Sequence, residues 1–119
     1  MTEEEFLDAV ENTPEDVGPL FEFTRELKKR GEKEKPRALL SRLAEAQREK
    51  DLPWARLETV LEIARAFPTR AASAEEVADA FREAYPGHPS LEALLSHYLK
   101  PKASVVDAAE KLRRWLTFK

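Results

Sequence analysis

The residue types that most often carry catalysis are scarce in this 119-residue sequence. Cysteine is absent, and the two histidines, His88 and His97, are nine residues apart, which does not fit the i, i+4 pair of a helical zinc site. Most serines stand where helices are expected to begin, so capping accounts for them. Only three glycines are present, and none forms a phosphate-cradling motif. We therefore expect no catalytic residue, no metal site, no cofactor and no enzymatic activity.

Adjacent carboxylates are the remaining candidates for acid–base chemistry. Glu75 and Glu76 lie in the expected first turn of a helix, as does the run of three glutamates at residues 3–5. Negative charge is favoured there by the helix dipole. Helix stabilisation therefore explains these pairs better than catalysis does.

The densest basic stretch, residues 25–37, holds seven bases against three acids. Cations near a helix end can neutralise phosphates, but glutamates interrupt this stretch and no aromatic residue is interleaved for base stacking. A nucleic-acid contact is therefore the less favoured use. Phe23 lies off the main apolar stripe of its expected helix, which indicates a second neighbour or a partner. The candidate partner-binding residues are Arg25, Lys28, Lys29, Arg30, Lys33, Lys35, Arg37 and Phe23.

Charge is segregated along the chain. Residues 1–22 carry eight acids and no Lys or Arg, whereas residues 100–119 hold six bases against two acids, within a formal net charge of −3. Two interpretations stay open: solvated helix faces that partly neutralise one another, or contact with a charged partner.

Apolar spacing is helical along the whole chain, and start and stop signals divide it into seven helices. Thr2 and Glu5 form a capping box, Gly31 follows three bases as a C-terminal signal, and Ser73, Ser90 and Ser104 are expected N-caps. The expected helices cover about residues 3–11, from Pro14 or Pro19 to Arg30, 36–50, 53–67, 74–85, 91–99 and 105–116.

Short connections make successive helices antiparallel. We predict an all-α domain over residues 1–119, with six or seven short antiparallel helices. They form either an α-solenoid of tetratricopeptide-like or HEAT-like type, without the consensus repeat, or an orthogonal bundle. The predicted core includes Trp54, Leu57, Leu61, Leu94, Leu112 and Trp115.

Composition bounds the class of protein. Charged residues make up 36% and hydrophobic residues 42%, and no apolar run approaches the ~20 residues that cross a bilayer. The acidic N-terminus lacks the apolar region of a secretory signal. With no cysteine to form disulfides, we expect a cytoplasmic protein without membrane contact.

From Phe21 to Lys119 the chain resembles the helical N-terminal module of large Gre-type transcription elongation (transcript-cleavage) factors. The resemblance rests on the runs at residues 26–31, 80–85 and 115–118 and on Leu39, Leu40, Leu43, Trp54, Ile63, Ala66, Phe67, Pro68, Ala108 and Leu112. In such proteins a small β-domain and the Gre portion follow, and that portion supplies the cleavage activity. Neither part is present here, so no catalytic residue is carried over. The resemblance implies either one domain of a longer protein or a stand-alone relative.

We expect a non-catalytic, helical protein–protein interaction module linked to transcription elongation. Its partner would be RNA polymerase or another transcription component. The alternatives are a small nucleic-acid-associated protein that uses the basic segments, and a structural or dimerisation domain. Salt dependence separates the first alternative, because phosphate binding weakens steeply as salt rises.

Overall fold

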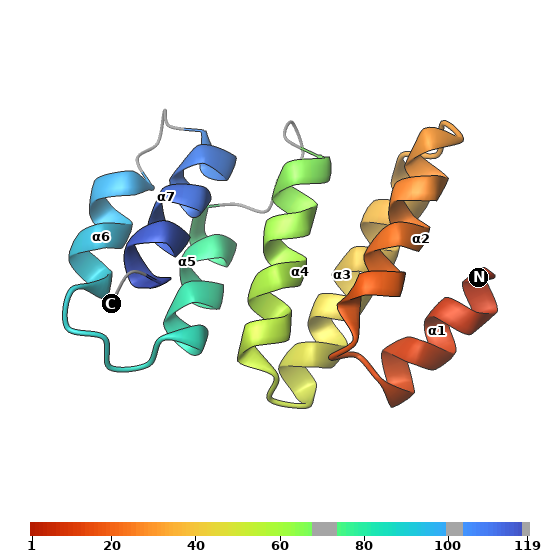
Figure 1. Ribbon diagram of the computed structural model, residues 1–119, viewed down its shortest axis with the longest axis horizontal. Coiled ribbons are helices and arrows are strands. Elements are labelled where there is room, and N and C mark those ends of the chain that lie inside the picture. Colours follow the sequence, from red (N-terminus) through yellow and green to blue (C-terminus); the bar gives the residue numbers. More distant parts are fainter. Residues whose placement is uncertain (68–73, 100–103, 118–119) are drawn as a thin grey trace.

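The computed structural model describes residues 1–67, 74–99 and 104–117. Across these residues the chain is entirely helical and contains no strand, which confirms the predicted all-α class (Figure 1). The helices are α1 (Glu3–Asn12), α2 (Val17–Lys29), α3 (Glu34–Glu49), α4 (Pro53–Ala66), α5 (Ala74–Ala84), α6 (Leu91–Tyr98) and α7 (Val105–Thr117).

Several helix ends follow the local signals in the sequence. The Thr2 hydroxyl accepts a hydrogen bond from the Glu5 amide, and the Glu5 carboxylate accepts one from the Thr2 amide, both at 3.1 Å. This is the expected capping box. Gly31 follows α2 with φ +92°, a conformation that favours glycine. Ser104 Oγ accepts from the Asp107 amide at 3.4 Å, as an N-cap does.

Some predicted helix starts are wrong, and α3 begins at Glu34 rather than at Pro36. α2 begins at Val17 rather than at Pro14 or Pro19. Pro14 is buried in the preceding turn, where its carbonyl accepts a hydrogen bond from the side-chain amide of Gln47 at 2.8 Å. Because a residue on α3 uses that carbonyl, Pro14 does not open the helix. The expected cap at Ser73 lies outside the described residues.

α6 begins at Leu91, as predicted, but the expected cap at Ser90 is wrong, because the Ser90 side chain makes no capping hydrogen bond. Its ψ is 3°, whereas Thr2, which does cap, has ψ 168°. A capping side chain reaches the helix amides from extended backbone, and Ser90 lacks that conformation.

α4 is the central element of the fold (Figure 1). It packs against α2 and α3 on one side and against α5 and α7 on the other. Eight of its residues are buried, including Arg56, Thr59 and Glu62. A helix with neighbours on several sides needs more than one buried stripe, which explains why polar side chains are also enclosed.

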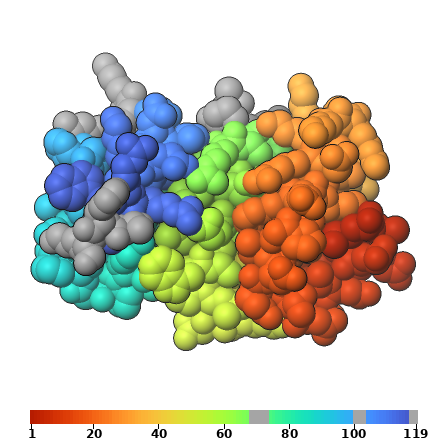
Figure 2. All heavy atoms as spheres, viewed as in Figure 1, coloured from red at the N-terminus to blue at the C-terminus, as the bar shows by residue number. Residues whose placement is uncertain are grey.

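Two apolar clusters meet at α4. The space-filling view shows the helices on both sides of α4 in contact as one continuous body (Figure 2). We name the two clusters the N-terminal core and the C-terminal core. The N-terminal core comprises Phe6, Val10, Leu20, Phe21, Leu27, Leu39, Leu40, Leu43, Ile63 and Phe67. The C-terminal core comprises Leu57, Val60, Leu61, Val77, Ala78, Ala80, Phe81, Ala84, Leu91, Leu95, Ala109, Leu112 and Leu116.

The helix order differs from a regular stack of hairpins. α7 returns to pack on both α4 and α5, while α6 packs mainly on α7. In a stack of successive pairs, the first helix of the last pair would be expected to approach the preceding pair. The described helices therefore form an all-α bundle around α4, and a tetratricopeptide-like or HEAT-like solenoid stays a prediction.

The predicted core is confirmed for Leu57, Leu61 and Leu112, which are buried. It is wrong for both tryptophans. Trp54 is 55% exposed and Trp115 is 54% exposed, while Leu94 is half-buried against the C-terminal core.

Each tryptophan has a local reason for its exposure. Trp54 lies in the first turn of α4, and its ring packs edge-to-face on Tyr85, a partly buried residue beside the C-terminal core, at 4.8 Å between ring centroids. On α7, Leu112 and Leu116 occupy the stripe that faces this core. The neighbouring Trp115 is consequently turned away from it.

Candidate functional site

Arg25, the first cation of the basic stretch, binds a buried carboxylate. Its Nε and Nη2 donate hydrogen bonds to the two oxygens of Glu62, each at 2.8 Å. The Arg25 side chain is 55% exposed, but that of Glu62 is only 4% exposed. Hydrogen bonding to Glu62, followed by its electrostatic attraction, raises the pKa of Arg25 above its ordinary value. Arg25 therefore joins α2 to α4 and neutralises a charge inside the fold.

Three more of the candidate cations have partners within the chain. Lys28 donates to the carbonyl of Ala66 at the C-terminus of α4, where a cation is favoured by the helix dipole. Its ammonium also lies 5.2 Å from the centroid of the Phe67 ring. The remaining two form exposed ion pairs, Lys29 with Glu26 at 3.7 Å and Lys35 with Glu3 at 3.4 Å.

Lys35 links the basic stretch to the acidic helix α1. This contact matches the interpretation in which segregated charges neutralise one another within the fold. Lys50, at the C-terminal end of α3, also contacts α1, because its ammonium donates a hydrogen bond to the Glu11 carbonyl. Part of the charge asymmetry seen in the sequence is thus used to hold α1 on α3.

The other four candidate partner-binding residues differ in their exposure and contacts. Arg30 and Lys33 are exposed and have no ion pair among the residues that the structure describes, and Arg37 is half-buried. Phe23 is half-buried, with its ring centroid 5.6 Å from that of Phe6. It packs at the edge of the N-terminal core. The structure thus gives much of this candidate site an internal role, and partner binding by these residues stays a prediction.

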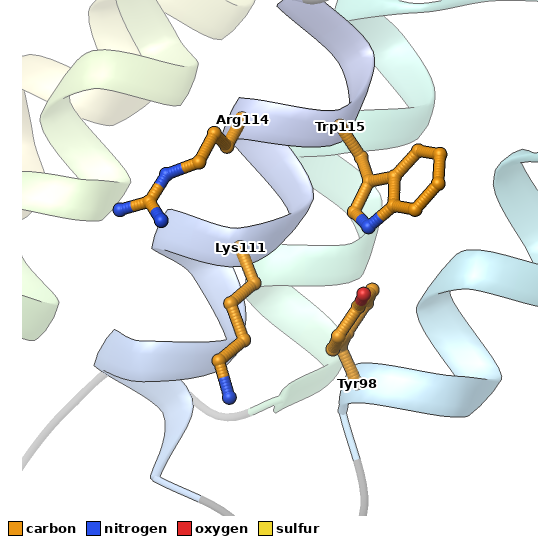
Figure 3. A pocket seen from close by; sticks show the side chains of 4 residues that line it. All are labelled: Tyr98, Lys111, Arg114 and Trp115. Carbon is orange, nitrogen blue, oxygen red and sulfur yellow. The ribbon is translucent and has the colours of Figure 1, made fainter.

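A different site, which the sequence reasoning missed, lies between α6 and α7. Tyr98, Lys111, Arg114 and Trp115 line a mainly apolar pocket of about 320 Å³. Figure 3 shows the Trp115 indole near the Tyr98 ring, with Lys111 beside Tyr98 and the Arg114 side chain extending from the same helix away from the two rings. Lys111 and Arg114 lie four and one residues before Trp115, and side chains at i and i+4 share one helix face.

Two of the other charges of α7, Glu110 and Arg113, are engaged elsewhere, whereas Asp107 is exposed one turn before Lys111. Glu110 accepts a hydrogen bond from Arg65 Nε at 2.9 Å, and Arg113 pairs with Glu58. Both contacts tie α7 to α4. Lys111 and Arg114 have no ion pair among the described residues and outnumber the single exposed acid Asp107, so the described rim of the pocket carries an excess of positive charge.

One sequence signal could have located this pocket. Residues 100–119 are basic overall, and Lys111, Arg114 and Trp115 stand at helical spacing within them. That pattern combines an aromatic anchor with cations on one face. The position of Tyr98 beside them is set by the packing of α6 on α7, which spacing alone does not reveal.

Comparison with protein-family models, curated proteins and solved structures gives no significant match.

Neither histidine is among the described lining residues of this pocket, although the His97 ring lies edge-to-face with the Tyr98 ring at 4.8 Å between centroids. His88 Nδ1 accepts a hydrogen bond from the Ser90 amide at 3.2 Å, and His97 is exposed on α6. Within residues 1–67, 74–99 and 104–117 no group of three or more potential metal ligands is present. None of the helices described there is long and apolar enough to cross a membrane.

Proposed function

We propose that this chain is a non-catalytic, helical protein–protein interaction module. The observation that carries the proposal is the exposure of Trp54 and Trp115, each more than half accessible in a fold with two well-filled apolar clusters. Tryptophan is among the residues most enriched at the energetic centres of protein interfaces. Covering these rings with a partner would remove apolar surface from water.

The more specific proposal is that the partner belongs to the transcription elongation machinery, either RNA polymerase or another component. Its support is the resemblance between residues 21–119 and the helical N-terminal module of Gre-type factors. The segregated charge of the chain would favour one docking orientation and would act mainly on the association rate.

A protein partner is favoured over a nucleic acid because of how the cations are used. Arg25, Lys28, Lys29 and Lys35 contact other groups of the chain, so fewer cations of this stretch are available for phosphates. Affinity for nucleic acid depends on the number of phosphates neutralised. We expect no sequence-specific DNA or RNA binding.

The proposal is tested by measuring binding of the chain to purified RNA polymerase core enzyme by biolayer interferometry at ~150 mM salt. We expect saturable binding that weakens at least about tenfold in a Trp54→Ala/Trp115→Ala variant. The matched control is Arg30→Ala/Lys33→Ala, which removes two exposed cations and keeps both rings.

Other outcomes assign other functions. Absence of polymerase binding would remove the transcription link. Loss of binding in the Arg30→Ala/Lys33→Ala control alone would move the interface to the basic stretch. Tight RNA or DNA shifts at the same salt, without polymerase binding, would establish the nucleic-acid alternative. A dimer in sedimentation velocity that dissociates in the tryptophan variant would establish a dimerisation role.

A further inference from the structure

The pocket between α6 and α7 combines an apolar interior with a cationic rim. We propose that it receives one large apolar side chain from an acidic segment of a protein partner. This inference rests on the proposed interaction function and assigns a ligand chemistry to one of its two exposed tryptophans.

The size and walls of the pocket indicate which side chain of a partner it would bind. A volume of about 320 Å³ lies at the lower end of the ~300–1,000 Å³ typical of ligand pockets. Such a space suits a side chain or two better than a whole helix. Its walls are the Trp115 indole and the Tyr98 ring (Figure 3), which pack well against aromatic or branched aliphatic groups. A Phe or Leu side chain is the expected occupant.

The charge of the pocket rim indicates which residues of the partner should flank the apolar side chain. Lys111 and Arg114 are exposed and have no ion pair within the described part of the chain. The neighbouring Glu110 is paired with Arg65, and the exposed Asp107 one turn before Lys111 offsets only one of the two cations, so the rim keeps an excess of positive charge. Charge complementarity therefore favours Asp or Glu residues flanking the apolar anchor, and it would also speed the encounter.

A nucleic-acid strand fits this pocket less well. Binding of a single strand without sequence preference usually combines a basic groove along the backbone with several stacking platforms. Here the described lining offers two cations and two aromatic rings around a single pocket of about 320 Å³, which is short for a strand bound along its backbone. An apolar interior also favours an aliphatic or aromatic side chain over a polar nucleobase. The nucleic acid is therefore retained as an outcome of the test.

The test measures fluorescence anisotropy of three labelled 12-residue peptides at ~150 mM salt. The first has a central Phe flanked by Asp and Glu, the second replaces Phe by Ala, and the third replaces the acids by Lys. A labelled oligouridine is titrated in parallel. The Trp54→Phe variant leaves Trp115 as the only tryptophan, so its emission reports directly on the pocket.

We expect the acidic Phe peptide to bind and to shift the emission of Trp115. Affinity should fall at least about tenfold for the Ala peptide, for the Lys peptide and for Lys111→Glu/Arg114→Glu. The matched control is Arg42→Glu/Arg48→Glu, which makes the same change of charge at two exposed cations of α3 outside the pocket lining and should bind the peptide within about threefold of wild type.

Four results would overturn the inference: no peptide binding up to about 1 mM, equal losses in the two charge-reversal variants, binding without a change in Trp115 emission, or tighter binding of oligouridine. Because the substituted cations are exposed, circular dichroism should show both charge-reversal variants folded; Lys111→Ala/Arg114→Ala replaces the reversal if they are not.

Failure of this inference and failure of the proposed function are distinguishable. If polymerase binds Lys111→Glu/Arg114→Glu as tightly as wild type, the pocket is not the polymerase interface. If the acidic peptide binds at the pocket but polymerase does not, the pocket chemistry stands and the transcription link falls.

Discussion

Removal of the Arg25 guanidinium should reveal how much the fold depends on the buried carboxylate of Glu62. Arg25 lies on the exposed side of α2, yet it binds both carboxylate oxygens of Glu62, a residue of α4 whose side chain is almost fully buried. Arg25→Ala would leave that carboxylate without its charged partner. The perturbation therefore acts on the interior although the substituted residue is exposed.

The expected loss of unfolding free energy follows from the exposed fractions of the Arg25 and Glu62 side chains. Removing one partner of a fully buried ion pair costs about 3–5 kcal/mol, because an uncompensated charge remains inside. Here the guanidinium side is open, so water can approach Glu62 once Arg25 is gone, and exposed pairs contribute far less. We expect Arg25→Ala to lower the free energy of unfolding by about 2–3 kcal/mol, compared with about 0.5 kcal/mol or less for an ordinary surface substitution.

The assay is urea unfolding followed by far-ultraviolet circular dichroism at neutral pH. Arg30→Ala, an exposed substitution in the same stretch, is the control and should stay within about 0.5 kcal/mol of wild type. The double variant Arg25→Met/Glu62→Leu should recover most of the loss, because it removes the orphaned charge and keeps apolar volume. A loss below about 0.5 kcal/mol for Arg25→Ala would refute a structural role for this pair.

Three further predictions concern packing and pH. Leu61→Ala should cost about 2–5 kcal/mol in the same urea titration, because Leu61 is only 2% exposed; a loss below about 1 kcal/mol would contradict its burial. Trp54→Ala should cost less than about 2 kcal/mol, well under the ~3–5 kcal/mol of a core tryptophan, and a larger loss would mean that the ring is enclosed. Arg82 donates hydrogen bonds to both Glu92 oxygens, at 2.7 and 3.1 Å, and thereby lowers the pKa of Glu92. This pair stabilises the fold above the ordinary pKa of a glutamate and ceases to do so as pH falls through the lowered value. Glu92→Gln should therefore be slightly less stable than wild type at pH 7 and equal to it near pH 2, and a difference that persists at low pH would contradict this linkage.

The sequence determined the helices because their signals are local. The capping box of Thr2 and Glu5 and the positive φ of Gly31 depend on residues within one turn of each other. The periodic apolar positions of α4 likewise identified Leu57 and Leu61 as core residues. Where a signal needed a partner from another helix, prediction failed, as at Pro14, whose carbonyl is bound by Gln47.

Tertiary structure decided which apolar and charged side chains face the interior. Trp54 and Trp115 lie on apolar stripes in the sequence, but in the packed fold both side chains are more than half exposed. Glu62 is an unremarkable glutamate in the sequence, and its burial follows from the position of α4 between two sets of helices. Its partner, Arg25, is 37 residues away.

The candidate site shows the same division. The chain alone identified the basic residues 25–37, but the fold assigned Arg25 and Lys28 to contacts with α4. It also brought Tyr98 of α6 beside Trp115 of α7. Helical periodicity fixes the direction of a side chain relative to its own helix axis, whereas the surroundings of that side chain are fixed only when other helices pack against it.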